Sequence, residues 1–133
     1  MTKGEKMDPL VLTRIKRGLD MPAPDYIDLF RIRREMIARA RTITRPFDAM
    51  ILPTCPIVAP AIDEVATPET FMQKNMLLLR NTALFNFLDR CAITVPIHAL
   101  GEAPVGLMLV GEHGHDRRLI SAGLGVEAAL ASR

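Results

Sequence analysis

Apolar residues recur at helical spacing in two segments of the N-terminal part of the sequence. Asp8, which precedes a proline, is a favourable helix start, and the apolar residues after it share one face until Pro22. A longer apolar stripe follows Asp25, which we expect to cap its helix, and continues to about Arg45 before the next proline. The pattern predicts a short amphipathic helix followed by a long one.

The pattern changes to short apolar runs in the remainder of the sequence. Residues 49–52 end at Pro53, and we expect them to form a buried strand that leads into a proline-rich loop. Residues 92–95 and 105–110 are similar runs, separated by a polar loop that contains glycine. These two runs are expected to form an antiparallel pair of strands.

Helical patterns return between and after these runs. Thr67, a proline and Glu69 form a helix start, and we predict helix from there to about residue 88, with a candidate break at Asn81. Asp116 is expected to cap the last helix. The residues of that helix that we expect to face inward are Leu119, Ile120, Leu124, Ala128 and Ala131.

The predicted order of elements is helix, helix, strand, helix, strand, strand, helix. This order favours an α/β arrangement in which helices cover a sheet. So small a sheet is thin, and strands of this kind are usually covered on both faces and paired at both edges. We therefore expect apolar faces and open edges if these residues fold by themselves.

Length, composition and charge narrow the class of protein. The 133 residues are 49% hydrophobic and 24% charged, which is typical of a globular domain with one core. The net charge of +2 does not indicate a polyanionic partner, and the acidic residues Asp25, Asp28, Glu35 and Asp48 lie within or beside the arginine-rich segment 31–45. We interpret that segment as a solvated helix face and expect no nucleic-acid partner.

The sequence pattern predicts neither a membrane-spanning segment nor a secretory signal. The most apolar stretch, residues 49–62, is interrupted by prolines, and it is shorter than the roughly 20 residues that cross a bilayer. The N-terminal lysines precede no apolar run of secretory length. We expect a cytoplasmic protein with no membrane association.

Cysteine and histidine spacing indicates no disulfide and no metal site. Cys55 and Cys91 lie in apolar surroundings, where free cysteine usually packs as a small hydrophobe. His113 and His115 have acidic neighbours, but the spacing matches no closed zinc pattern. We interpret this segment as a surface loop before a helix.

Three stretches of the sequence carry a resemblance to a known family. Residues 47–60 contain a strand-like run followed by Pro-Thr, residues 81–96 read NTALFNFLDRCAITVP, and residues 101–111 read GEAPVGLMLVG. Together they resemble the C-terminal third of the amidase signature family. The resemblance implies an amide hydrolase or transferase.

The resemblance also implies a fold and a division of the chain. The fold is the C-terminal portion of the amidase-signature α/β/α fold, with helices packed on a small mixed sheet. The whole chain is then a single partial domain, with residues 1–22 as an N-terminal helix and linker and residues 23–133 as the amidase-like segment. The sequence departs from the family at one turn, where Asp89, Arg90 and Cys91 stand in place of glycine, an apolar residue and proline.

The catalytic groups that the resemblance implies have no counterpart in the sequence. Family members hydrolyse a carboxylic amide to the acid and ammonia or an amine, using a serine nucleophile, a second serine and a lysine base, without a metal or organic cofactor. Such a serine needs a base within hydrogen-bond reach and preorganised donors for the oxyanion. Ser121 falls inside the last predicted helix and Ser132 is next to last, and no Gly/Ser-rich loop accompanies them. We therefore assign no catalytic residue and no cofactor.

The resemblance implies that four residues line the substrate pocket. In the family, the Pro-Thr loop comes near the acyl-binding side of the active site. So does the segment before the family's Asn-Leu-x-Gly motif, which corresponds to residues 86–89 here. These positions correspond to Thr54, Cys55, Arg80 and Asn81, which we expect to face a small-molecule amide in a complete enzyme. The structural alternative is that Thr54 closes a loop, Asn81 caps a helix, and Arg80 is solvated or ion-paired.

Three functional hypotheses follow from these observations. The first is a C-terminal segment of an amidase-type hydrolase that lacks the catalytic residues and supplies sheet and substrate-pocket wall. The second is a non-catalytic remnant that acts as an interaction or oligomerisation module, binding a copy of itself or an N-terminal amidase portion. The third is a complete small enzyme in which Cys55, with His98 and Asn81, acts as nucleophile.

Overall fold

The computed structural model of the chain describes residues 3–132. The chain divides into two compact units, Met1–Glu35 and Met36–Arg133. Helix α2 (Ala23–Thr44) crosses the boundary, so its first turns belong to the first unit and its last turns belong to the second. The features that bear on function lie in the second unit.

The first unit contains a short helix whose start follows the prediction. Helix α1 (Pro9–Lys16) is preceded by Asp8, whose carboxylate accepts hydrogen bonds of 2.9 and 3.2 Å from two backbone N–H groups of the first turn. The 3-10 turns η1 (Lys3–Lys6) and η2 (Arg17–Asp20) lie before and after this helix. The predicted helix start at Asp8 is confirmed.

The long helix α2 begins earlier than expected, and Asp25 lies in its first turn. The carbonyl of Pro22 accepts a hydrogen bond of 3.1 Å from the N–H of Tyr26, so helical bonding starts before Asp25. Pro24 fits the first turn, because the N–H that proline lacks would have no helical partner there. The expected cap at Asp25 is therefore wrong, whereas the long helix is confirmed.

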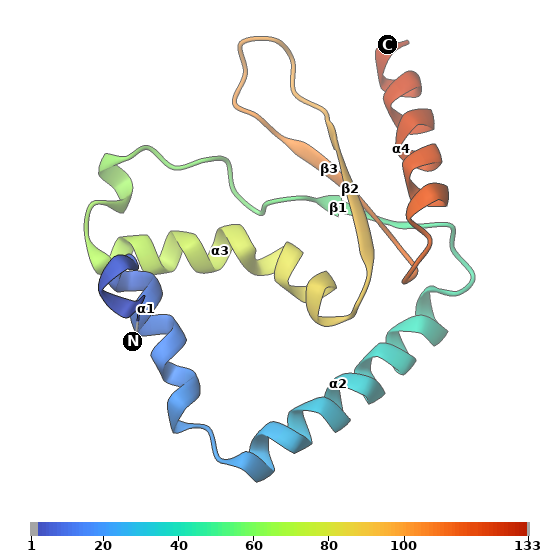
Figure 1. The fold of residues 1–133 in the computed structure, drawn as a ribbon. Helices are drawn as coiled ribbons and strands as arrows, with labels where there is room; N and C mark the ends of the chain where they lie inside the picture. Colours follow the sequence, from blue (N-terminus) through green and yellow to red (C-terminus); the bar gives the residue numbers. More distant parts are fainter. Residues whose placement is uncertain (1–2, 133) are drawn as a thin grey trace. The chain divides into compact units, whose positions relative to one another are not determined.

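The second unit is built on a sheet of three strands in the order β1-β3-β2 (Figure 1). The strands are β1 (Met50–Pro53), β2 (Cys91–Pro96) and β3 (Gly106–Gly111). Both neighbouring pairs are antiparallel, so the expected pairing of the last two runs is confirmed. The expected mixed sheet is wrong for the described residues, because the central strand β3 runs opposite to both of its neighbours.

Helices cover both faces of this sheet. The further helical elements are the 3-10 turn η3 (Asp63–Val65), α3 (Pro68–Phe87) and α4 (Asp116–Ala131). Side chains alternate along β3: Met108 and Val110 pack with Phe85 of α3, whereas Leu109 packs with Leu119 of α4. Each of the three strand residues is only 2% exposed. The predicted α/β fold with helices on a sheet is confirmed.

Helix α3 starts as predicted but has no break. The Thr67 side chain accepts a hydrogen bond of 3.3 Å from the N–H of Thr70, and the Thr70 side chain accepts one of 3.3 Å from the N–H of Thr67. After this capping box the helix continues through Asn81 to its end. The candidate break at Asn81 is wrong, because the Asn81 side chain bonds to a strand carbonyl and leaves its own helix intact.

Helix α4 packs on the sheet through smaller residues than expected. Leu119 is buried, as expected, but a Cβ on the buried Gly123 would come within 3.0 Å of the Ile93 side chain of β2. The remaining residues of this inward face are Ala122, Val126 and Leu130. The expected inward residues that are instead exposed are Ile120, Leu124, Ala128 and Ala131. The expected inward orientation of these four residues is wrong. The close approach at Gly123 places a different face of the helix against the sheet.

The start of α4 lies one residue before the expected cap. His115 precedes the helix, and its carbonyl accepts a hydrogen bond of 3.0 Å from the N–H of Leu119. Asp116 is then the first helical residue. The expected cap at Asp116 is therefore wrong, although its carboxylate still lies in the first turn, where negative charge is favourable.

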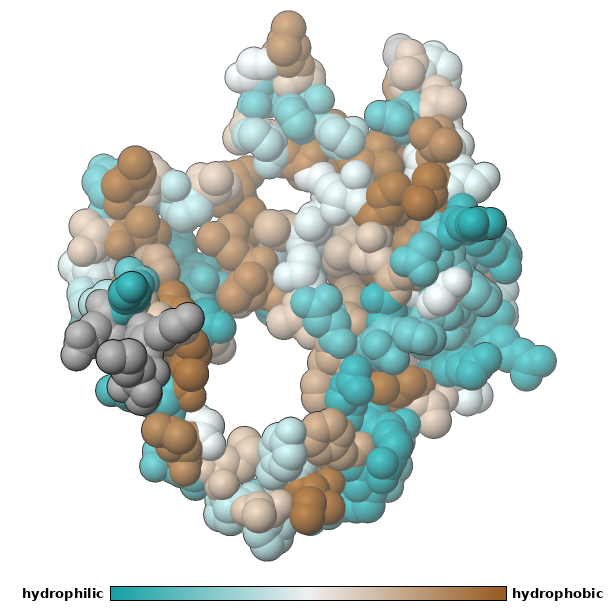
Figure 2. Space-filling model, viewed as in Figure 1, coloured by the Kyte–Doolittle hydropathy of each residue, from teal (hydrophilic) through white to brown (hydrophobic). Residues whose placement is uncertain are grey.

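Part of the sheet is not covered by a helix. Ile51 of β1 is paired in register with Leu109, so the two side chains share a face, yet Ile51 is 67% exposed. Strands β1 and β2 form the two edges of the sheet. Figure 2 shows hydrophobic residues reaching the surface over the sheet and α4. The expected open face and edges are present in the described residues.

Candidate functional site

The end of strand β1 is fixed by bonds from Thr54. The Thr54 N–H donates to the carbonyl of Gly106 at 2.9 Å, and the Thr54 hydroxyl donates to the same carbonyl at 3.2 Å. Thr54 Oγ1 also lies 3.0 Å from Thr94 Oγ1. This packing requires glycine at Gly106, because a Cβ there would lie 2.4 Å from Thr94 Cγ2 and 2.9 Å from Thr54 Oγ1. The Pro-Thr loop therefore leaves the sheet in a fixed geometry.

Helix α3 brings two further predicted residues to the same strand end. Asn81 Nδ2 donates to the carbonyl of Pro53 at 2.7 Å, and Arg80 Nε donates to Asn81 Oδ1 at 3.4 Å. We call Pro53, Thr54, Arg80 and Asn81 the Pro-Thr corner. Three of the four predicted pocket-wall residues thus lie together, and their role toward a substrate stays a prediction.

The fourth predicted residue, Cys55, is exposed next to the corner. His98 Nδ1 accepts a hydrogen bond of 3.2 Å from the N–H of Val105, and the Asn81 amide is bonded to Pro53. No hydrogen bond among residues 3–132 joins Cys55 to His98 or to Asn81. A Cys55 nucleophile therefore has no hydrogen-bonded base in this part of the chain.

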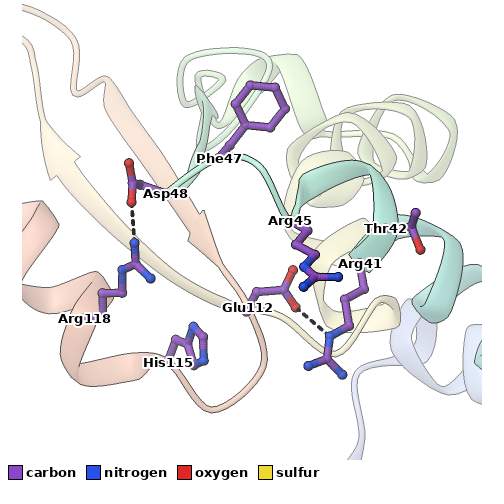
Figure 3. Close-up of a pocket in the computed structure, with 8 residues that line it drawn as sticks. All are labelled: Arg41, Thr42, Arg45, Phe47, Asp48, Glu112, His115 and Arg118. Carbon is purple, nitrogen blue, oxygen red and sulfur yellow. Dashed lines mark hydrogen bonds and ion pairs between the residues drawn. The ribbon is translucent and has the colours of Figure 1, made fainter.

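A pocket of about 510 Å³ lies at the end of α2, in the same unit. Its lining residues are Arg41, Thr42, Arg45, Phe47, Asp48, Glu112, His115 and Arg118. We call it the arginine pocket. Figure 3 shows Arg41 and Arg45 projecting from the end of α2 on the side of Glu112, and Arg118 reaching from α4 to Asp48, with which it forms an ion pair. The pocket was not predicted from the sequence.

Glu112 connects this pocket to the interior. It forms an ion pair with Arg90, whose side chain is 3% exposed, and its Oε1 accepts a hydrogen bond of 2.9 Å from the Thr44 hydroxyl. Arg41 Nε lies 3.9 Å from Glu112 Oε2. Partial burial alone raises the pKa of Glu112, but hydrogen bonds from Arg90 and Thr44 and the charges of Arg90 and Arg41 outweigh burial and lower the pKa. The carboxylate is therefore charged at neutral pH.

Sequence reasoning missed the pairing of Arg90 with Glu112. Arg90 was noticeable only as a departure from the apolar residue usual in the resembling family. The structure explains the turn: Asp89 has a φ of 57°, and the N–H of Arg90 donates to the carbonyl of Phe85 at 3.0 Å, which closes the end of α3. Arg90 Nη2 is buried and has no hydrogen-bond partner among the described residues. The available signal was an arginine at the start of an apolar strand-like run, at a position where the family usually has an apolar residue.

Among residues 3–132 neither serine side chain has a hydrogen bond to a histidine or a lysine, although Ser121 lines a shallow pocket together with His115. Ser121 is exposed on α4, and the Ser132 hydroxyl donates to the carbonyl of Ala129 at 2.9 Å. The same residues hold no group of three or more His, Cys, Asp or Glu side chains placed to bind a metal ion. None of the described helices is long and apolar enough to pass through a lipid bilayer.

Comparisons with known proteins give a consistent result. A family model described as Amidase matches residues 1–120. The 2-amino-5-chloromuconic acid deaminase of Comamonas testosteroni is 32% identical over 129 residues, which are 96% of this chain and 28% of that protein. A glutamyl-tRNA(Gln) amidotransferase subunit of Sulfolobus acidocaldarius is 29% identical over 102 residues, which are 77% of this chain and 21% of that protein.

A solved structure shares the arrangement described above. A crystal structure of an amidase superposes with a TM-score of 0.73 at 25% identity, over 96% of this chain and 30% of that chain. The chain therefore spans less than a third of this structure and of both proteins compared above. The likeness concerns one segment of a larger fold.

Proposed function

The chain belongs to the amidase family, and we propose that it supplies sheet and pocket wall to an amide hydrolase whose reacting serine and lysine lie outside these residues. The reaction is hydrolysis of a carboxylic amide to the acid and ammonia or an amine. The observation that carries the proposal is the Pro-Thr corner, where strand and helix bring Thr54, Arg80 and Asn81 together. We place the protein in the cytoplasm.

The groups in the Pro-Thr corner suit an amide substrate. Loops beyond strand ends are where α/β folds bind ligands. The Arg80 guanidinium uses Nε toward Asn81, which leaves its Nη groups to donate to a carbonyl or carboxylate oxygen. Asn81 is a positioning residue, because its amide is already bonded to Pro53. We assign the substrate-facing role to Arg80 and Thr54, with the exposed Cys55 at the rim.

We assign the catalytic groups to another part of the enzyme because the serines of this chain lack a hydrogen-bonded base among residues 3–132. A serine hydroxyl is a weak nucleophile unless a base lies within hydrogen-bond reach. Ser121 has no side-chain hydrogen bond to a lysine or histidine among the described residues, and Ser132 is bonded to a helix carbonyl. The chain's own contribution is therefore to bind and orient the substrate, without a cofactor.

The exposed apolar area favours a second candidate function. Ile51, Ile120 and Leu124 are 67%, 52% and 61% exposed. Exposed apolar patches are typical of surfaces that another chain or another segment covers. The alternative is a non-catalytic interaction module that binds a copy of itself or the remaining part of an amidase.

The substitution Arg80→Gln, in the complete protein that contains this chain, tests the first proposal. We expect the KM for the amide substrate to rise about tenfold with little change in kcat, because one charge-assisted hydrogen bond of about 1.5 kcal/mol is lost. Steady-state ammonia release from a panel of carboxylic amides measures both constants. Gln73→Ala, at an exposed position of the same helix, is the control and leaves KM unchanged. An unchanged KM in Arg80→Gln contradicts the proposal.

A further inference from the structure

The arginine pocket holds more positive charge than its own carboxylates neutralise. Glu112 is neutralised from the interior by Arg90, which has almost no contact with solvent. Asp48 is neutralised by Arg118 across the pocket. Two further guanidinium groups lie on the pocket wall, and one of them only shares Glu112 with Arg90, whereas the other has no carboxylate partner among the described residues.

These two groups are Arg41 and Arg45. Arg41 is 77% exposed, and its Nε lies 3.9 Å from Glu112 Oε2, which is beyond hydrogen-bond distance. The Arg45 side chain makes no hydrogen bond or ion pair among residues 3–132, and it lines the same pocket. The pocket is therefore short of about two negative charges.

The position of the two arginines on α2 makes this excess charge costly. Arg41 and Arg45 are separated by four positions, and the N–H of Arg45 donates to the carbonyl of Arg41 at 3.0 Å, so their side chains leave the same side of the last turn. Like charges at this spacing repel each other, although the negative end of the helix dipole reduces the repulsion. An anion bound between the two guanidinium groups would remove the repulsion.

We propose that the arginine pocket is a binding site for a small phosphate-type dianion. Guanidinium groups donate pairs of parallel hydrogen bonds to phosphate oxygens, which suits two arginines on one wall. A volume of about 510 Å³ admits a small ligand. The site shares no residue with the Pro-Thr corner, so it does not depend on the proposed amide hydrolysis.

Titration of the complete protein with inorganic phosphate tests this site. Isothermal calorimetry is carried out at constant ionic strength, with chloride as the reference anion. We expect saturable binding of one phosphate per chain, and we expect Arg41→Gln and Arg45→Gln each to weaken it about tenfold, the loss of one charge-assisted contact. Circular dichroism shows that each variant remains folded.

Matched variants separate a built site from general electrostatic attraction. Arg39→Gln removes the same charge from an exposed position of α2 that does not line the pocket, and we expect it to leave phosphate affinity unchanged. Arg45→Lys keeps the charge but loses the guanidinium fork, and we expect an intermediate affinity. No saturable phosphate binding, an equal loss in Arg39→Gln, or tighter binding of succinate than of phosphate overturns the proposal.

Discussion

At the residue scale, Arg90 depends on a single carboxylate. Its side chain is 3% exposed, and its described charged partner is Glu112. A buried cation that loses its counter-charge is strongly destabilising, because the protein interior solvates an unpaired charge poorly. The Thr44 hydroxyl and Arg41 hold the other side of the same carboxylate, so Glu112 joins α2 to the segment that follows β3.

Replacing this carboxylate tests its importance for stability. Because folding lowers the pKa of Glu112, its charged form stabilises the fold above the ordinary carboxyl range, and this contribution is lost as the pH falls below that range through the lowered pKa. We expect Glu112→Gln to lose about 3 kcal/mol at neutral pH and to lose less further stability in acid than the parent chain. Denaturant unfolding across this pH range measures both effects. Glu127→Gln, exposed on α4, is the control, and equal acid sensitivity in Glu112→Gln contradicts the assignment.

The sequence located single residues better than it located their contacts. Thr54, Arg80 and Asn81 were predicted from the resemblance and do lie together. The bond from Asn81 to a carbonyl of β1 was not predictable, because it joins positions far apart in the sequence. The Arg90 pairing was missed for the same reason, since Glu112 follows a different strand.

At the scale of elements, the end of α3 contains a residue in an unfavourable conformation. Asp89 has a φ of 57°, where a residue with a Cβ is strained and glycine is not. We expect Asp89→Gly to stabilise the fold by about 0.5–1 kcal/mol and Asp89→Ala to destabilise it. Thermal unfolding measures both effects, and the two variants can be compared directly because both lose the contact of 3.3 Å between Asp89 Oδ2 and His113 Nδ1. A destabilising Asp89→Gly contradicts this reading of the turn.

Helix α4 offers two glycines with opposite expected responses. A Cβ at Gly123 meets Ile93 at 3.0 Å, whereas a Cβ at Gly125 meets nothing within 4 Å. We expect Gly123→Val to lose about 1–3 kcal/mol through overpacking and Gly125→Ala to gain about 0.5–1 kcal/mol through helix propensity. Urea unfolding of the two variants measures the difference. Equal effects would show that α4 does not approach β2 through Gly123.

The order and type of the elements were predictable, but the faces that pack were less so. Local signals sufficed for the caps at Asp8 and Thr67, because the bonds involved span only a few residues. The face of α4 was assigned wrongly, because large apolar residues were taken as inward while Gly123 allowed the close contact. The antiparallel pairing of β1 with β3 was also not predicted. These strands are far apart in the sequence, and no local pattern indicates which distant strands pair.

At the scale of the whole molecule, the fold is that of a segment within a larger family architecture. The chain spans 28% of the deaminase and 30% of the amidase chain that it resembles. Strands β1 and β2 are edge strands, and the apolar residue Ile51 is exposed, so a further strand or another segment would find backbone groups and apolar surface to bind here. These features agree with our proposal that the reacting groups belong to another part of the enzyme.

The most direct test compares ammonia release from carboxylic amides by the chain of 133 residues alone and by the product of the complete reading frame that contains it. We predict hydrolysis by the complete product and none by the chain alone, because the chain holds binding groups without a serine and base in contact. Amide hydrolysis by the chain alone, abolished by blocking the Cys55 thiol, would contradict this account and make the chain a small cysteine-dependent enzyme. A complete product without amide hydrolysis would also contradict it and would favour the interaction module.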